Sequence, residues 1–160
     1  MSAIAAADNG GMTIQHVSSR CTALIKSEEG YQARRYLCPA GKPTIGYGHV
    51  ILPHENFPQP MTKAAAEALL LRDLAPVENY LSATFPGINQ HQFDALACFA
   101  FNVGVGALDH STLKRRLLAG DVAGAADEFK RWVHAGKTVL PGLIKRRAAE
   151  RELFLTPEAT

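Results

Sequence analysis

Residues 27–50 hold the side chains of this 160-residue sequence that are best suited to acid–base chemistry. The stretch reads SEEGYQARRYLCPAGKPTIGYGHV and contains Glu29, Cys38, Thr44 and His49. A carboxyl group that stays neutral near pH 7 can protonate a leaving oxygen. A thiol can ionise, with a reference pKa of about 8.5. A hydroxyl group can hold a water molecule through its lone pairs.

Glu29 has a position that favours its protonated form. Apolar residues recur at helical spacing over residues 13–29, and Gly30 is a C-terminal stop signal, so we expect a helix that ends at Glu29. The C-terminal end of a helix carries partial negative charge, which disfavours a second one, and burial against a neighbouring sheet acts in the same direction. The alternative is that Glu28 and Glu29 are ordinary exposed acids.

The elements that follow must position this helix end. Over residues 31–50, β-prone residues interrupted by proline and glycine predict a hairpin or a three-stranded sheet, and residues 51–60 predict a loop. Beyond residue 61 the apolar periodicity is helical. The expected helices run from Thr62 to about Ala75, where Pro76 kinks or ends the helix, from the Asn89 cap, over Thr112 to Leu118, from the Asp121 cap to about Val133, and from Pro141 onward.

The length predicts one domain, and the expected order of one helix, a small sheet and then several helices predicts an α+β, mostly α fold. We expect residues 1–12 to form a flexible tail and residues 13–160 a single domain. Within this domain, residues 13–60 are expected to form a lobe with the small sheet, and residues 61–155 a helical lobe.

Composition argues against several functional classes. A net charge of +2 is too small to indicate nucleic-acid binding. The three cysteines form neither a disulfide framework nor a zinc-ligand pattern, so we expect no metal and no cofactor. The sequence has no run of about 18 apolar residues, so we expect no stable membrane insertion. Basic residues near the C-terminus alternate with acids and predict a solvated helix face: Lys145, Arg146, Arg147 and Arg151.

The sequence resembles the phage lysozymes, muramidases that hydrolyse peptidoglycan. Their motif is a Glu-Gly pair, an Asp or sometimes a Cys at a fixed distance, a Thr at a second fixed distance, and then I-G-x-G-H. Glu29, Cys38 and Thr44 fit both distances, and residues 45–49 complete the motif. Further similar blocks extend the resemblance over residues 17–155: QFDAL, FNVG, STL, EFKRW and PGLIKRRAAE.

The resemblance implies catalytic roles for three residues. Glu29 is implied to be the general acid, and Thr44 to hold the attacking water. Cys38 occupies the second catalytic position, where the family usually has Asp. A thiolate there, favoured by a neighbour such as Arg34 or Arg35, could position water or stabilise charge. Alternatively, Cys38 attacks as a nucleophile or is only a small packing residue.

The resemblance also implies residues around this centre. His49 is expected to form a structural ion pair with Asp73 rather than to act as a base. Further positions match those that line the saccharide cleft, although helical spacing fits Phe101 equally well to a core role: Val50, Phe101, Asn102 and Thr112.

We therefore expect a lysozyme-like fold, with the active-site cleft between a small β-sheet lobe and a helical-bundle lobe. The expected function is that of an endolysin that cleaves the β-1,4 bond between N-acetylmuramic acid and N-acetylglucosamine. A lytic transglycosylase and a non-catalytic wall-binding module are the alternatives. We expect a monomer whose partner is peptidoglycan. Residues 1–11 do not resemble a secretory signal, so we expect synthesis in the host bacterial cytoplasm and release to the wall by a holin.

Overall fold

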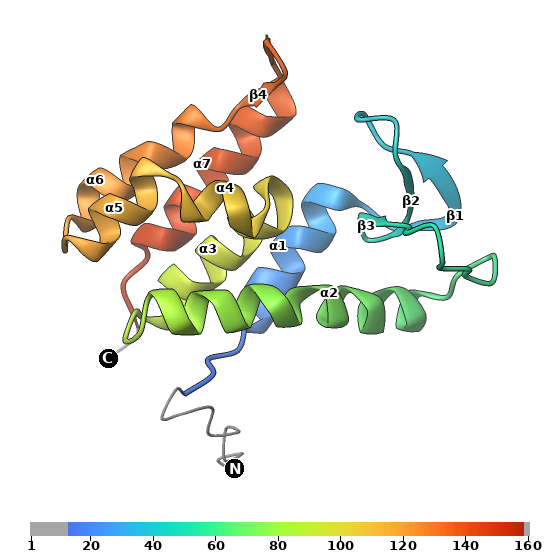
Figure 1. The fold of residues 1–160 in the computed structure, drawn as a ribbon, viewed down its shortest axis with the longest axis horizontal. Helices are drawn as coiled ribbons and strands as arrows, with labels where there is room; N and C mark the ends of the chain where they lie inside the picture. The colour runs from blue at the N-terminus through green and yellow to red at the C-terminus, as the bar shows by residue number, and fades with distance from the viewer. Residues whose placement is uncertain (1–12, 159–160) are drawn as a thin grey trace. The chain divides into compact units, whose positions relative to one another are not determined.

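Residues 13–158 are described in the computed structural model, and the predicted tail at residues 1–12 lies outside them. The fold is α+β and mostly helical, as predicted (Figure 1). Its elements are α1 (Ser19–Glu29), β1 (Gln32–Leu37), β2 (Pro43–Gly46), β3 (His49–Val50), α2 (Lys63–Thr84), α3 (Gln90–Val103), α4 (Val105–Asp109), α5 (Thr112–Leu118), α6 (Val122–Glu128), the 3₁₀ helix η1 (Phe129–Arg131), β4 (His134–Ala135), β5 (Thr138–Val139) and α7 (Pro141–Leu155).

The chain divides into two compact units. Unit 2 comprises Thr22–Pro76, and unit 1 comprises the described residues on either side of it, 13–21 and 77–158. We expected a lobe boundary at residue 60. Helix α2 begins at Lys63, directly after the predicted cap Thr62. Ala66 and Leu69 of this helix belong to the same apolar core as Ile45 of the sheet, so the first part of α2 lies in unit 2.

Helix α2 does not end at its proline. Of the two expected outcomes at Pro76, a kink or an end, the end does not occur, because α2 continues to Thr84. A proline inside a helix removes one backbone hydrogen bond. Burial of Leu74, Val77 and Leu81 on both sides of Pro76 offsets that loss.

Unit 2 is built on a three-stranded antiparallel sheet in the order β1-β2-β3. Ile45 on β2 pairs with His49 on β3, so the two side chains share one face of the sheet. That face covers an apolar core to which Ile45, Met61, Ala66 and Leu69 contribute. The three-stranded alternative of the sequence prediction is therefore the one that forms.

A network of charged groups fastens the loop after β3 to α2. His49 Nδ1 lies 2.7 Å from Asp73 Oδ2, and His49 Nε2 lies 2.8 Å from Glu55 Oε1. Glu55 also accepts from the backbone N–H of Leu52 at 2.8 Å and from Arg72 Nη2 at 2.9 Å. The Leu52 N–H first, and His49 next, lower the pKa of Glu55 to about 2. We call this set of side chains, His49, Glu55, Arg72 and Asp73, the His49 clamp.

In unit 1, the segment before α1 is held by side chains and does not form the helix predicted from residue 13. The backbone N–H groups of Gln15, Val17 and Ser18 donate to Ser82, Glu78 and Asp94, respectively, each at 2.8 Å. Because these donors have side-chain acceptors, α1 begins only at Ser19.

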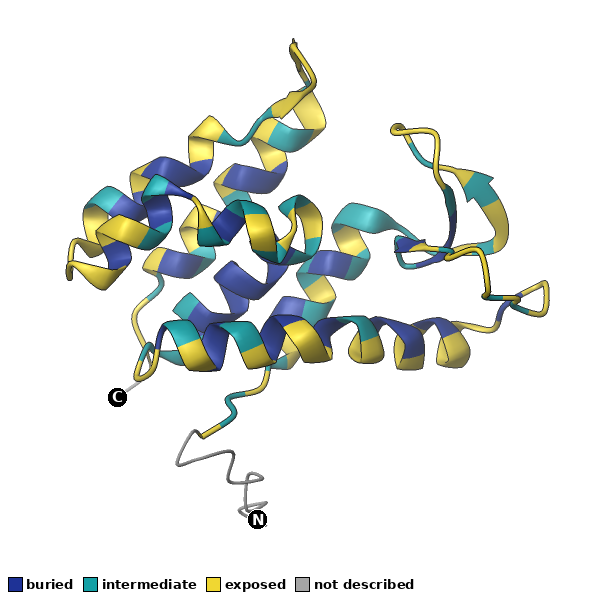
Figure 2. Cartoon of the chain, in the orientation of Figure 1, coloured by how far each residue is buried: buried dark blue, intermediate teal, exposed yellow. Residues whose placement is uncertain are grey.

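Local signals located most of the unit 1 helices. Asn89 forms a capping box with Gln92 at the start of α3, a helix whose residues 93–100 are all buried (Figure 2). Asp121 caps α6, and Pro141 is the first residue of α7. All three assignments are confirmed. Helix α4 and the short β4–β5 hairpin were not predicted, because a two-residue strand shows too little alternation to be recognised.

Helix α6 is shorter than predicted, because the helix was expected to continue to about Val133. α6 ends at Glu128, and η1 turns the buried Phe129 towards Phe154, with ring centroids 5.4 Å apart.

The prediction of a solvated basic face on α7 is wrong for Arg146 and Arg147, which are both buried. They can be buried because a carboxylate on the same helix, Glu150, pairs with both of them.

No helix among residues 13–158 has the length and apolar character needed to cross a bilayer.

The His49 clamp predicts a specific loss of stability in acid. A carboxylate with a depressed pKa contributes stability that is present above its unfolded pKa and is lost as the pH falls towards its folded pKa. The wild-type free energy of unfolding should therefore fall between about pH 4.5 and about pH 2, partly through Glu55. Glu55→Gln should be less stable at pH 7 and should lack this part of the acid dependence, as measured by urea unfolding across that pH range.

Glu67→Gln is the control for this prediction. Glu67 forms a surface ion pair with Lys26 at 3.0 Å in the same unit, and exposed pairs contribute little to stability. Its acid profile should match that of the wild type. A Glu55→Gln profile that also ran parallel to the wild type would remove Glu55 from the stabilising network.

Candidate active site

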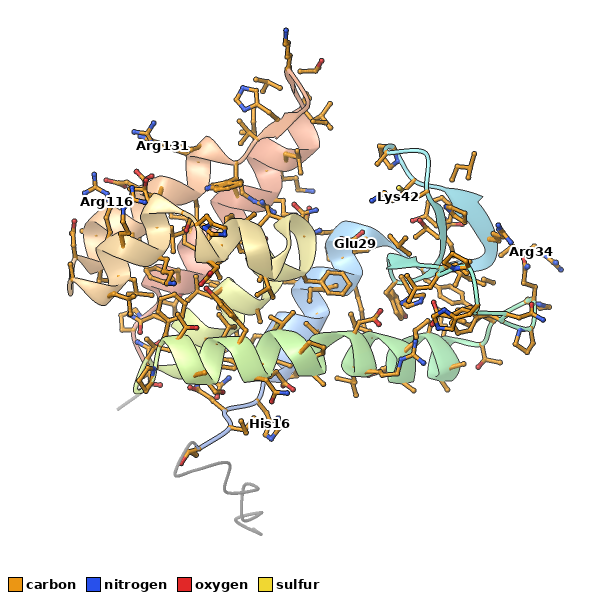
Figure 3. All side chains as sticks on the ribbon, in the orientation of Figure 1. His16, Glu29, Arg34, Lys42, Arg116 and Arg131 are labelled. Carbon is orange, nitrogen blue, oxygen red and sulfur yellow. The ribbon has the colours of Figure 1, made fainter. Side chains whose placement is uncertain are left out.

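Glu29 is held against a glycine in the turn between β2 and β3. It is the last residue of α1, and Figure 3 shows its side chain near the sheet. A β-carbon added at Gly48 would lie 2.7 Å from Glu29 Oε1 and 2.9 Å from its Cδ, closer than real contacts allow. Gly48 also has φ +78°, which favours glycine. This turn therefore admits the carboxyl group only because residue 48 has no side chain.

One row of side chains crosses the sheet on the face opposite Ile45. Tyr36 on β1 pairs with Thr44 on β2, and Thr44 pairs with Val50 on β3. Directly opposed residues project to the same face, so these three side chains lie next to one another. Thr44 is buried and Val50 is exposed. Thr44 and Val50, which were both predicted for the site, are therefore neighbours, and Tyr36 lies next to Thr44.

Cys38 lies in the turn that follows β1. Its backbone N–H donates to Lys42 O at 2.9 Å, and its carbonyl accepts from the Gly41 N–H at 2.7 Å. The Lys42 backbone N–H lowers the pKa of the Cys38 thiol below its ordinary value, with the Ala40 N–H and the Thr44 hydroxyl acting in the same direction and burial opposing them. The turn therefore favours the thiolate.

Backbone groups thus take the role that the sequence suggested for Arg34 or Arg35. Figure 3 shows Arg34 pointing outward from β1, on the side away from Glu29. Lys42 lies in the turn itself, and its charge makes a smaller contribution than its backbone N–H. Arginine positions read from a sequence do not reveal which amide hydrogens a turn gathers, so this cause could not be predicted.

Thr44 links the turn to the sheet. Its hydroxyl donates to Lys42 O at 2.9 Å, and it also lies within hydrogen-bonding reach of the Cys38 sulfur. A hydroxyl has one proton and two lone pairs. The proton can therefore go to Lys42 O or to the Cys38 sulfur, but not to both at once, and the lone pairs remain acceptors for a water molecule.

Tyr36 was missed by the sequence analysis. Burial first, and then the negative charges of Glu29 and Cys38, raise the pKa of its phenol. Tyr36 therefore keeps its proton at neutral pH, and its hydroxyl group can act as a hydrogen-bond donor. It precedes Cys38 by two residues in a predicted strand region, a spacing that could have indicated a shared face.

His49 and Asp73 lie together, as expected from the resemblance, at 2.7 Å. His49 is buried on the core side of the sheet, and its ring contacts Phe57 edge-on at a centroid distance of 5.4 Å. Its second carboxylate partner, Glu55, was not predicted, because no spacing rule connects a loop residue to a strand in this way.

The remaining predicted contacts belong to unit 1. Phe101 is half-buried, which leaves its two interpretations open. Asn102 is exposed, and its Oδ1 accepts from Arg147 Nη2 at 2.8 Å. Thr112, the first residue of α5, accepts from Arg115 Nη2 at 2.8 Å.

The described residues contain no group of three or more His, Cys, Asp or Glu side chains placed to hold a metal ion. All three cysteines are free thiols. Burial raises the pKa of Cys21 and of Cys98, so Cys38 alone among the three has a thiol whose pKa is lowered.

Curated relatives of the chain are endolysins of bacteriophages. The chain is 41% identical over 145 residues to the endolysin of Acyrthosiphon pisum secondary endosymbiont phage 1, covering 87% of this chain and 97% of the relative. It is 44% identical over 140 residues to the endolysin of Bacillus phage B103, covering 85% of this chain but 52% of that longer protein. It is 35% identical over 134 residues to the SAR-endolysin of Bacteriophage PS119, covering 79% and 76% of the two chains.

Solved structures share the fold. The muramidase domain of SpmX from Asticaccaulis excentricus aligns with a TM-score of 0.81 and 38% identity, covering 89% of this chain and 99% of that domain. A single-residue mutant of P22 lysozyme aligns with a TM-score of 0.77 and 36% identity, with the same coverage. The model of the phage lysozyme family matches residues 26–150, which contain the whole Glu29–Cys38–Thr44 motif. The chain belongs to the phage lysozyme family.

Proposed function

We propose that this peptidoglycan hydrolase, a lysozyme-type glycoside hydrolase, cleaves the β-1,4 bond between N-acetylmuramic acid and N-acetylglucosamine. Glu29 is the general acid, Thr44 holds the attacking water, and the Cys38 thiolate occupies the second catalytic position. The observation that carries the proposal is the convergence of Cys38 and Thr44 on one turn in the unit that also holds Glu29.

The location of Glu29 supports its role as proton donor. The carboxyl group belongs to the last residue of α1, in the unit that also holds Cys38 and Thr44. Its contact with Gly48 leaves it little freedom to move. A general acid must be fixed within hydrogen-bonding reach of the leaving oxygen, and restricted motion contributes to that placement.

The Cys38–Thr44 pair supports water activation. A thiolate next to Thr44 can accept a proton or a hydrogen bond from a water molecule that Thr44 also holds. It can equally stabilise positive charge developing at the anomeric carbon. In this role the thiolate replaces the carboxylate that is usual in the family, and the products have inverted configuration.

Nucleophilic attack by Cys38 is the second candidate mechanism, favoured by the lowered pKa of its thiol. The thiolate sulfur would form a bond to the anomeric carbon as Glu29 protonated the leaving oxygen, and water would later hydrolyse the thioglycoside. Two displacements retain configuration. Product stereochemistry therefore separates the two mechanisms.

A lytic transglycosylase needs the acid but no attacking water. Burial of Thr44 next to the Cys38 turn favours hydrolysis, because an acceptor for water is then built into the site. Mass analysis of digested peptidoglycan distinguishes reducing ends, produced by hydrolysis, from anhydro-muramic ends. A non-catalytic wall-binding module would produce neither.

The saccharide contacts remain the four residues expected from the resemblance. Val50 is exposed beside Thr44 on the sheet of unit 2, and Asn102 is exposed at the end of α3 in unit 1. We assign these two as polymer contacts together with the half-buried Phe101 and Thr112.

We also propose that the chain is made in the host cytoplasm and reaches the wall through holin lesions. The relative that this chain covers over 97% of its length, at 41% identity, is named endolysin, whereas the relatives named SAR-endolysin are 33% to 40% identical and are covered over 58% to 92% of their length. Cells that express the chain alone should therefore keep growing until a holin is co-expressed. Lysis without a holin would instead indicate export of its own.

Glu29→Gln should lose activity by about 10² to 10⁴, because an amide of the same shape cannot donate the acidic proton. The measurement is the rate of reducing-end release from purified peptidoglycan, with circular dichroism to check the fold. A folded variant with near-native turnover would exclude Glu29 as the acid.

Gly48→Ala tests whether activity depends on the position of the Glu29 carboxyl group, which lies against Gly48. The new β-carbon must displace the Glu29 carboxyl, and displacement by about 1 Å can cost on the order of 100-fold in rate. Gly87→Ala is the matched control, since Gly87 has φ +85° and a β-carbon added there would have nothing within 4 Å. Both variants should lose about 1–2 kcal/mol of stability, but only Gly48→Ala should lose activity.

Cys38→Ala should reduce turnover by about 100-fold or more, whereas Cys38→Asp should retain much of it. The ordinary pKa of Asp is about 3.9, far below the 9.0 from which the Cys38 thiol is lowered, so Cys38→Asp should stay active at more acidic pH. The measurement is the pH profile of kcat/KM for both variants. If Cys38→Ala matched the wild type at equal stability, Cys38 would be a packing residue.

A further inference from the structure

Arg147 is a buried cation that forms a hydrogen bond with one exposed side chain, that of Asn102. It lies on α7 and is 1% exposed. Its Nε lies 2.7 Å from Glu150 Oε1, and its Nη2 donates both to Glu150 Oε2 at 3.1 Å and to Asn102 Oδ1 at 2.8 Å. Glu150 is fully buried, whereas Asn102 is exposed at the end of α3.

Packing leaves the guanidinium group little freedom to move. Its central carbon lies 5.0 Å from the centroid of the Phe99 ring, a cation–π arrangement. Phe99 is fully buried, and its ring packs against Phe129 at 5.2 Å and Trp132 at 5.6 Å. The direction in which Nη2 donates is therefore set by the core of unit 1.

The chemistry of arginine determines the orientation of the Asn102 amide. A guanidinium group has donors and no acceptor, so only the amide oxygen of Asn102 can face it. The amide NH₂ must then point away from Arg147. Among the described residues nothing accepts from this NH₂, on a side chain that is exposed to solvent.

We propose that Arg147 is a positioning residue that makes Asn102 a one-directional hydrogen-bond donor, and that this donor binds the acetamido carbonyl oxygen of an N-acetylated sugar. The proposal rests on the proposed function, because it takes the glycan strand as the ligand. A freely rotating asparagine could accept from a hydroxyl as readily as donate to a carbonyl. With its oxygen held by Arg147, Asn102 selects an acceptor and disfavours an amine.

Two substitutions at the exposed position separate this role from a structural one. Asn102→Asp keeps an oxygen for Arg147 and adds charge to that contact, but it presents a second oxygen outward in place of the NH₂. Asn102→Leu is similar in size and removes both interactions. Neither variant replaces a buried residue, so both are expected to fold.

If Asn102 has the proposed role, the variants should rank differently in thermal stability and in affinity for the glycan strand. Thermal midpoints should rank Asn102→Asp at or above the wild type, and Asn102→Leu about 2–6 °C below it, since Arg147 then loses an acceptor. Affinity is measured by calorimetric titration of glycan strands freed of stem peptides, in a Glu29→Gln background that leaves them intact. Both substitutions at Asn102 should raise Kd by about 2- to 10-fold, the effect of one lost hydrogen bond.

The chemistry of the strand tests which atom is recognised. On strands whose acetamido groups have been hydrolysed to amines, Asn102→Asp should lose no affinity relative to Asn102, because its carboxylate then faces an ammonium group. Equal losses on both kinds of strand would overturn the assignment to the acetamido oxygen. A loss confined to strands that carry stem peptides would overturn it in favour of a peptide carbonyl.

Asp127→Asn is the matched surface control in the same unit. It breaks the exposed Asp127–Arg151 pair, 3.1 Å apart, and should change neither quantity. If Asn102→Asp bound N-acetylated strands as tightly as the parent, or if the two orders ran parallel, Asn102 would be only a surface partner of Arg147. Hydrolysis by the otherwise wild-type chain tests the proposed function separately, so the two failures are distinguishable.

Discussion

The contact between Glu29 and Gly48 is the constraint on which the rest of unit 2 depends. A carboxyl group at the end of a helix is normally free to turn into water. Here the turn between β2 and β3 brings a backbone α-carbon so close that a β-carbon would lie 2.7 Å from the Glu29 oxygen. For the turn to stay in that position, the strand that follows must be fixed, and the next residue, His49, is held by carboxylates on both ring nitrogens. The His49 clamp therefore contributes to the placement of an acid at the end of α1.

Both units use buried charge to fix the direction of a side chain. Burying an ion pair contributes little net stability, because desolvation offsets much of the attraction. Burial does remove alternative conformations. Glu55 has its carboxylate oxygens occupied by His49, Arg72 and the Leu52 N–H. Arg147 is similarly restricted by Glu150 and by the face of Phe99. In unit 1, the exposed Asn102 in turn takes its orientation from the buried Arg147.

The sequence predicted features that local chemistry determines. The Asn89 cap, the first position of α7 at Pro141 and the limits of α5 follow from side chains acting on their own backbone. The motif around Glu29 located the candidate site for the same reason, since its spacing is set by one helix end and one hairpin. Features that depend on distant packing were missed. Arg147 lies in a charged stretch that is typical of a solvated face, and only its contacts with Phe99 and Glu150 explain its burial. Pro76 likewise carries a local signal that apolar burial on both sides overrides.

The Cys38 turn extends this reasoning to the chemistry. A carboxylate in the second catalytic position carries its own charge at neutral pH, so the surrounding backbone need only place it. A thiol must first be ionised. The Lys42 and Ala40 N–H groups, which converge where β1 turns into β2, supply that stabilisation, and the Thr44 hydroxyl adds to it. A cysteine in the place of the acid therefore depends on more than its own side chain. The hairpin must also hold the backbone N–H groups where they can stabilise the thiolate. The same hairpin holds Tyr36 and Thr44 in one row, so the backbone that stabilises the thiolate also fixes the neighbours with which it must act.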